Sequence, residues 1–206
     1  MHPYLTRLGV RPEVQVFFGP YFQSGKQGHL VFNYGDAAEH FGLAFHRIPV
    51  SENCWQAGCR GFNRVSLVVI CSSAMEAIAF YDFKYSVYTM PDSLLFIAVG
   101  TRPDCHQFRW INENVAGKKY LLVFGKELLD EIGELKTAAG ILKMLLEVES
   151  KFVYVKFRLT EYVLPINTFS LNAFEKLSGY RFSLKTARSK NGGNYLTQLK
   201  SAALNY

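Results

Sequence analysis

Cysteine and proline are scarce in this sequence, and each scarcity excludes a class of protein. Four cysteines in 206 residues are too few for a small scaffold held together by disulfide bonds, so we expect reduced thiols. Seven prolines together with 49% hydrophobic residues exclude the composition of a disordered chain. The length allows one domain with accessory pieces, but hardly three independent cores.

Long apolar runs are also missing. The longest ones span residues 67–71 and 94–99, far short of the roughly 20 residues that a membrane-crossing helix needs. Near the N-terminus, Pro3 and Arg7 stand where a secretory signal would have its uninterrupted apolar stretch. We therefore expect a cytosolic protein without a transmembrane segment.

The sequence does contain a repeated alternation of strand-like and helix-like segments. Apolar, β-branched runs at 65–71, 94–99, 119–124 and 152–157 are typical of strands covered on both faces. Apolar residues at helical spacing follow each of the first three runs: one helix begins after Ser73, one at Pro103, and one covers 128–146. A break near Gly140 is possible within the last of these helices. The pattern predicts an α/β fold with a mostly parallel four-stranded sheet and helices on both of its faces.

The flanking regions have a different character. Short strands are predicted at 15–18, 29–34 and 42–48, which indicates a small antiparallel layer before the α/β core. Short helices are predicted at 171–177 and 195–204, on either side of a basic stretch. We therefore expect a β-rich segment over residues 1–62, an α/β core over 63–160, and a basic extension over 161–206 that packs on the core.

The order of these segments resembles a known family. Residues 69–78, which run Val-Ile-Cys-Ser-Ser-Ala-Met-Glu-Ala-Ile, resemble the first motif of the Toprim fold of primases and topoisomerases, in which a glutamate ends a strand. In particular, the chain looks like the Toprim-like domains of primase-related proteins from plasmids and mobilisable elements, with further likenesses at 4–10, 30–32, 42–46 and 118–124 and a weaker one at 190–196. The resemblance implies a Toprim-like fold and an ancestor that used one glutamate and an aspartate pair for metal-dependent chemistry.

This sequence departs from the family at those acidic positions. Ser72 stands in place of the glutamate, and Gly125 and Glu127 stand in place of the aspartate pair, with Lys126 between them. Magnesium needs hard anionic oxygens, and a lysine beside the former ligands opposes a cation. Glu76 and Glu127 are the acids that remain, so we expect no catalytic residues and no cofactor; Mg²⁺ enters only if the altered site still works.

Basic residues suggest a binding role. The chain carries 23 Lys and Arg against 17 Asp and Glu, a formal net charge of +6. Cations interleaved with aromatic residues are typical of surfaces that contact phosphates and stack on bases, although a solvated face explains them equally well. The candidates for nucleic-acid binding are Lys126, Arg181, Lys185, Arg188 and Lys190.

Other candidate residues have structural explanations. Ser72 and Ser73 fit helix N-caps better than nucleophiles, and His46 and His106 fit structural or surface roles. Cys54 and Cys59 with a histidine would make a zinc site only at the wide limit of ligand spacing. Acids at the start of the helix that begins near residue 128 complement the helix dipole whatever the function.

Three functional hypotheses remain. The first, which we favour, is a catalytically degenerate Toprim-like protein that binds nucleic acid, with single-stranded DNA and the proteins of a replication or mobilisation complex as its partners. The second is an active metal-dependent nucleotidyltransferase or nuclease that uses Glu76, Glu127 and either Asp104 or Asp130. The third is a protein-interaction scaffold that binds through its aromatic N-terminal layer.

Overall fold

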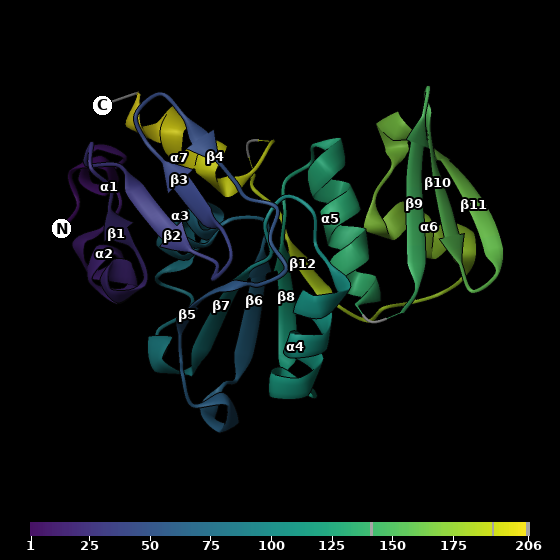
Figure 1. The fold of residues 1–206 in the computed structure, drawn as a ribbon, viewed down its shortest axis with the longest axis horizontal. Coiled ribbons are helices and arrows are strands. Elements are labelled where there is room, and N and C mark those ends of the chain that lie inside the picture. The colour runs from purple at the N-terminus through teal and green to yellow at the C-terminus, as the bar shows by residue number, and fades with distance from the viewer. Residues whose placement is uncertain (141, 191, 205–206) are drawn as a thin grey trace.

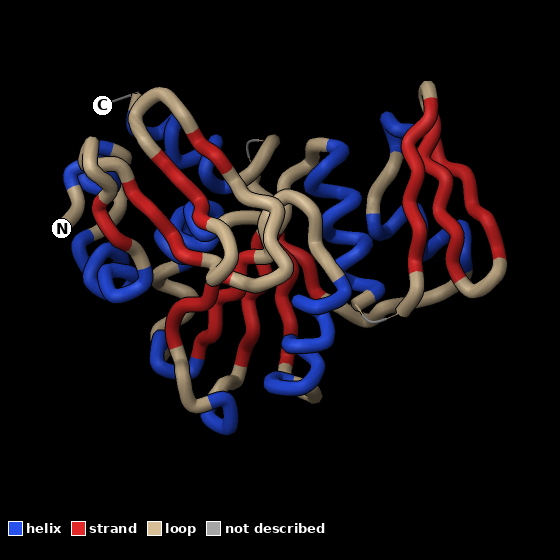
Figure 2. Tube along the Cα trace, viewed as in Figure 1, coloured by secondary structure: helices blue, strands red, loops and turns tan. Residues whose placement is uncertain are grey.

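The central feature is a five-stranded sheet in the order β12-β8-β6-β7-β5 (Figures 1 and 2). The computed structural model describes residues 1–140, 142–190 and 192–204. Strands β6, β7, β8 and β12 are parallel, and β5 pairs antiparallel with β7. The strand bounds are β5 Trp55–Gly58, β6 Leu67–Cys71, β7 Leu94–Ala98, β8 Lys119–Val123 and β12 Lys185–Ala187.

Helices cover both faces of this sheet, as the apolar character of the strands predicts. Alternate strand residues point to opposite faces, so Val69 packs in one core cluster and Val68 in the other. Helices α3 (Ala74–Lys84) and α7 (Tyr195–Ala203) contribute to the first cluster, and α4 (Cys105–Val115) and α5 (Leu128–Ala139) to the second. The described part of the chain is therefore a mixed α/β protein.

The predicted N-terminal antiparallel layer is present. It is a sheet of β1 (Gln23–Ser24), β2 (Leu30–Asn33), β3 (Ala38–Phe41) and β4 (His46–Arg47), preceded by α1 (Pro3–Arg7) and α2 (Pro12–Phe18). The strand expected at 15–18 is wrong: Pro12 occupies the first turn of α2, and Val14 and Phe18 are buried at the i, i+4 spacing of a helix. The strand expected over 42–48 is shorter because a turn from Gly42 to Phe45 precedes β4.

The assignment of 152–157 to the central sheet is also wrong. This segment is β10 (Phe152–Phe157), which pairs antiparallel with β9 (Met144–Glu149) and β11 (Thr160–Pro165) in a separate sheet beside α5 (Figure 1). Val153 and Val155 are buried, whereas Phe152 and Lys156 are exposed, the alternation of an antiparallel strand with one solvent face. The fourth parallel strand of the central sheet is β12, which pairs with β8.

Two further boundaries follow from this small sheet. Helix α5 ends at Gly140, where φ is +59°, and the residues from Met144 onward form β9 rather than a continued helix. The predicted segment boundary at residues 160–161 falls within the β10–β11 hairpin. Helix α6 (Leu171–Ser178) packs against β11 and α5. Four short 3₁₀ turns complete the described elements: η1 (Gly19–Tyr21), η2 (Phe62–Arg64), η3 (Pro91–Ser93) and η4 (Ile166–Thr168).

No helix within the described residues combines the length and the apolar composition that crossing a membrane requires. All four cysteines are free thiols.

Candidate functional site at the carboxyl edge of the sheet

The topology defines one crevice in the central sheet. The chain passes from β6 to β7 on one side and then to β8 on the other side of β6, so the order reverses between β6 and β8. Ligands of open α/β sheets bind at the carboxyl ends of the strands at such a reversal. Ser72 follows β6 and Gly125 follows β8, so the structure brings two of the altered motif positions to this crevice.

Asp130 of α5 occupies the crevice. Burial raises the pKa of its carboxylate, and the neighbouring Ser72 side chain and Gly125 backbone oppose this increase. A side chain at position 125 would have its Cβ about 3.0 Å from Cγ of Asp130 and closer still to a carboxylate oxygen. Gly125 is therefore what leaves room for Asp130.

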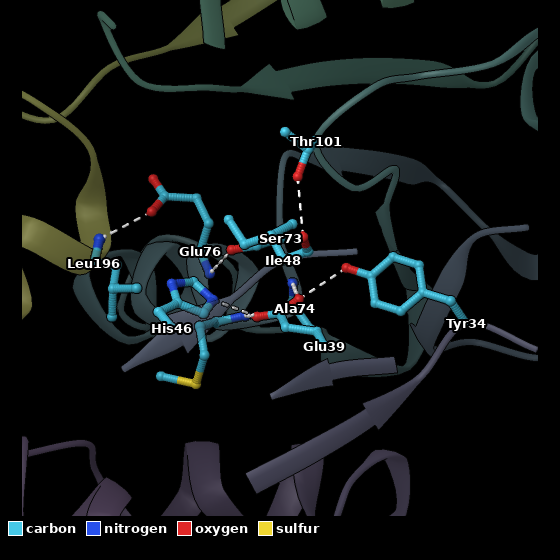
Figure 3. Close-up of polar contacts among 10 residues, drawn as sticks. Tyr34, Glu39, His46, Ile48, Ser73, Ala74, Glu76, Thr101 and Leu196 are labelled. Atoms are coloured by element: carbon cyan, nitrogen blue, oxygen red, sulfur yellow. Dashed lines mark hydrogen bonds and ion pairs between the residues drawn. The ribbon is translucent and has the colours of Figure 1, made fainter. Parts of the chain in front are cut away.

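Glu76 lies beside the crevice, with its carboxylate directed at α7. The side chain is fully buried and accepts a hydrogen bond from the backbone N–H group of Tyr195 (2.7 Å). It accepts a second one from the N–H group of Leu196 (2.9 Å), which Figure 3 shows. Burial raises the pKa of Glu76 to about 7, although both hydrogen bonds oppose the increase. The glutamate thus occupies the anion position at the N-terminus of α7.

Glu39 of β3 does the same for α3. Its fully buried carboxylate accepts hydrogen bonds from the backbone N–H groups of Ala74 (2.7 Å) and Met75 (3.1 Å), and from the Tyr34 hydroxyl (2.8 Å). Nε2 of His46 lies 2.9 Å from Oε1 of Glu39, whereas the Tyr34 hydroxyl donates to Oε2 (Figure 3). A phosphate bound at the start of α3 would need the position that this carboxylate fills.

Arg188 neutralises a second group of acids, on α5. Its guanidinium pairs with Glu131 at 2.9 Å and with Glu134, and it also donates to the Phe124 and Gly125 carbonyls. Burial raises the pKa of Glu134 to about 7, with Arg188 opposing the increase. One oxygen of Glu134 is buried without a hydrogen-bond partner among the described residues.

The five candidate nucleic-acid contacts do not gather in one patch. Lys126 and Lys190 are exposed beyond the carboxyl ends of β8 and β12, whereas Lys185 begins β12 and so lies at the opposite edge. Arg181 follows α6 and pairs with Glu175 at 2.9 Å. Arg188 is the cation already described, with a side chain 25% exposed.

The remaining motif positions stand at the N-cap positions of helices. Glu127 is exposed at the N-cap position of α5 and makes no side-chain capping bond. In the 190–196 segment, Asn194 caps α7 by accepting a hydrogen bond from the Thr197 N–H (2.8 Å), whereas Asn191 lies outside the described residues. Ser73 caps α3 by accepting from the Glu76 N–H (3.0 Å), so its capping role is confirmed.

At the positions of Ser72, Gly125 and Glu76, no carboxylate is left free for a magnesium ion. Ser72 and Gly125 supply no carboxylate, and both oxygens of Glu76 already accept backbone hydrogen bonds. Within the described residues, only one cluster brings three potential ligand atoms within 4.8 Å of one another; it consists of Asp104, Cys105 and His106. These are consecutive residues at the start of α4, where Asp104 serves as the N-cap.

Sequence reasoning missed Glu39 and treated Asp130 mainly as an acid at a helix start. A signal for Glu39 was available: in the strand 38–41 it shares a face with Phe41, so an acid stands where the alternation requires a buried residue. Nothing in the local sequence shows that Asp130 reaches Ser72, because that contact depends on how α5 packs.

Comparisons of the chain with protein-family models, with curated proteins and with solved structures give no match.

Proposed function

We propose that this chain is a catalytically inactive Toprim-like protein that binds single-stranded nucleic acid at the carboxyl edge of its central sheet. In this proposal it serves in the cytosol as an accessory factor in the replication or mobilisation of a mobile element. The resemblance of residues 69–78 and the order of β6, α3, β7 and β8 support the Toprim-like assignment.

One observation carries the binding proposal. Exposed cations follow three of the parallel strands at the same edge: Arg102 after β7, Lys126 after β8 and Lys190 after β12. Among the described residues none of the three forms an ion pair. We call these three residues the edge cations. Free cations along one edge suit a polyanion whose phosphates are spaced along a backbone.

The arrangement of the acids supports binding without catalysis. Glu39 and Glu76 are directed at helix N-termini, and Arg188 pairs with Glu131 and Glu134 of α5. These four carboxylates therefore lie inside, while the edge cations face solvent. A metal-dependent reaction needs the reverse, with carboxylates open to an ion and a substrate phosphate.

The test is a fluorescence-anisotropy titration of labelled single-stranded DNA at two salt concentrations, with and without magnesium. Three phosphate contacts predict that affinity falls about 20-fold between 50 and 200 mM salt. Binding that ignores magnesium is expected, since no described cluster at the crevice fits the ion. The absence of binding at low salt would refute the proposal, and a magnesium-dependent reaction product would favour the active enzyme instead.

Matched variants show whether the edge matters or only the total charge. The double variant Lys126→Ala/Lys190→Ala removes two edge cations, and Lys119→Ala/Lys185→Ala removes two exposed lysines from the amino ends of the same two strands. We expect the first variant to bind several-fold more weakly with a shallower salt dependence, and the second to bind like the unmodified chain. Equal losses in both would contradict an interface at the carboxyl edge.

A further inference from the structure

A polar cleft lies between α4 and the loops of the N-terminal half of the chain. Its volume is about 590 Å³, within the range of small-molecule sites. It is separate from the crevice that Asp130 fills. We call it the amide cleft. The polar and aromatic side chains that line it are Asn33, Tyr34, Glu52, Asn53, Gln56, His106, Gln107 and Trp110.

The cleft has a fixed wall and free polar groups. Gln107 donates hydrogen bonds to the carbonyls of Asn53 and Val99, both at 2.8 Å, and this joins the start of α4 to the loop that forms the opposite side. By contrast, within the described chain no hydrogen bond is made by the Gln56 amide, the His106 ring or the Trp110 indole N–H. These groups are available to a ligand.

Trp110 supplies a flat apolar surface in this polar setting. The indole is half-buried and its orientation is held by an edge-to-face contact with Phe62, at 5.7 Å between ring centroids. A partly exposed aromatic ring of fixed orientation is a platform on which another planar ring stacks. The amide side chains nearby offer both donors and acceptors, the groups that read the edge of a heterocycle.

The charge of the cleft excludes a phosphate as the group bound inside it. Among the residues that the structure describes, no lysine or arginine lines the amide cleft, and Glu52 contributes a carboxylate. A carboxylate repels phosphate but accepts hydrogen bonds from an amino group such as that of cytosine or adenine. A neutral planar ring that carries an amino group fits all these features.

We propose that the amide cleft binds a nucleobase, stacked on Trp110 and hydrogen-bonded by Gln56 and Glu52, with a preference for bases that carry an exocyclic amino group. The inference rests on the proposed function, because the nucleobase that enters the cleft is an unstacked base of the bound strand. Arg102 is an edge cation only four residues before His106, so the two lie no more than about 14 Å apart. A strand held at the edge is therefore within reach of the cleft.

The experiment uses nucleosides, which carry no phosphate, and records the indole N–H signals in a ¹H–¹⁵N correlation spectrum. The chain has two tryptophans, and Trp55 is an internal reference because it is buried and donates to the Tyr21 carbonyl at 2.8 Å. We expect adenosine and cytidine to shift the Trp110 signal progressively and to leave Trp55 in place. Ribose 5-phosphate, which has no base, is expected to shift neither.

Variants separate recognition from damage to the fold. Gln56→Leu and Glu52→Gln keep the indole as a probe; the first is expected to weaken binding and the second to abolish the preference for cytidine over thymidine. Trp110→Ala, followed by competition against a fluorescent adenosine analogue, is expected to weaken binding at least tenfold, and Trp110→Phe by less. Unchanged Trp110 signals with every nucleoside, or equal shifts with ribose 5-phosphate, would overturn the proposal.

Failure of the cleft and failure of the proposed function give different results. If nucleosides shift Trp110 but single-stranded DNA is not bound, the cleft is a site for a free nucleoside and the strand-binding proposal falls. If DNA binds through the edge cations while nucleosides leave Trp110 unchanged and Trp110→Ala binds DNA normally, the cleft proposal falls alone.

Discussion

Replacing Glu39 by glutamine tests whether an internal carboxylate holds the N-terminus of α3. Each oxygen of Glu39 accepts from one backbone N–H of the helix, Ala74 at one and Met75 at the other. A glutamine has the same shape but only one acceptor oxygen. Whichever way its amide is turned, the NH₂ group faces an N–H donor, so one hydrogen bond is lost and one buried donor has no partner.

The expected cost follows from the number and kind of bonds. A hydrogen bond to a charged group contributes about 1.5–3 kcal/mol, and an anion at a helix N-terminus about 0.3–2 kcal/mol more. Because the side chain is fully buried, water cannot replace either contribution. We expect Glu39→Gln to lower the free energy of unfolding by about 2–5 kcal/mol and the Tm by roughly 10 °C.

Urea unfolding followed by far-UV circular dichroism measures this change. Tyr34→Phe removes only the hydroxyl that donates to Glu39, so it should cost about 1 kcal/mol and give an intermediate value. Glu149→Gln makes the same chemical change at an exposed position of β9 and should stay within about 0.5 kcal/mol of the unmodified chain. If Glu39→Gln were no less stable than Glu149→Gln, the proposed role of this carboxylate would be refuted.

Three further substitutions test the carboxyl edge by the same unfolding assay. Arg188→Ala leaves buried acids without their cation and should cost about 3–5 kcal/mol at pH 8. The pKa of Glu134 is raised to about 7, so ionisation of this buried acid lowers the stability of the folded chain as pH rises from about 4.5 through 7. At pH 5 Glu134 is mostly neutral and needs its cation less, so the cost of Arg188→Ala should be smaller there. An equal cost at both pH values would contradict this. Gly125→Ala should cost about 1–3 kcal/mol because its Cβ meets Asp130, and much less in an Asp130→Ala background; additive effects would show that the two positions are independent. Ser73→Ala removes the cap of α3 and should cost about 1 kcal/mol, and no measurable loss would mean that the cap is dispensable.

The sequence predicts the parts of this fold that local pattern determines. Strands β6, β7 and β8 and the helices after them follow from continuous apolar runs and helical spacing, and they are confirmed. The segment 152–157 was misplaced because its β-branched residues were read as a buried run, although their alternation with Tyr154 and Lys156 is typical of a one-sided strand. Strand β12 has three residues and is too short to give a periodic signal.

The candidate site was less predictable because its contacts join distant parts of the chain. The sequence singles out Ser72, Gly125 and Glu76 through a resemblance, but it does not show that Glu76 accepts hydrogen bonds from the start of a helix about 120 residues later. Likewise, the basic stretch 181–190 is continuous in sequence, yet β12 passes through it and carries Lys185 and Lys190 to opposite ends of a strand. Tertiary structure therefore decides which charges face the same partner.

These contacts together explain why the crevice and the edge support different roles. The anion positions of α3 and α7 are filled by Glu39 and Glu76, and Asp130 fills the gap between β6 and β8. An aspartate at position 125 would displace Asp130 without freeing either helix N-terminus. A phosphate that meets this surface therefore meets the edge cations first, which favours binding along the rim over chemistry within the crevice.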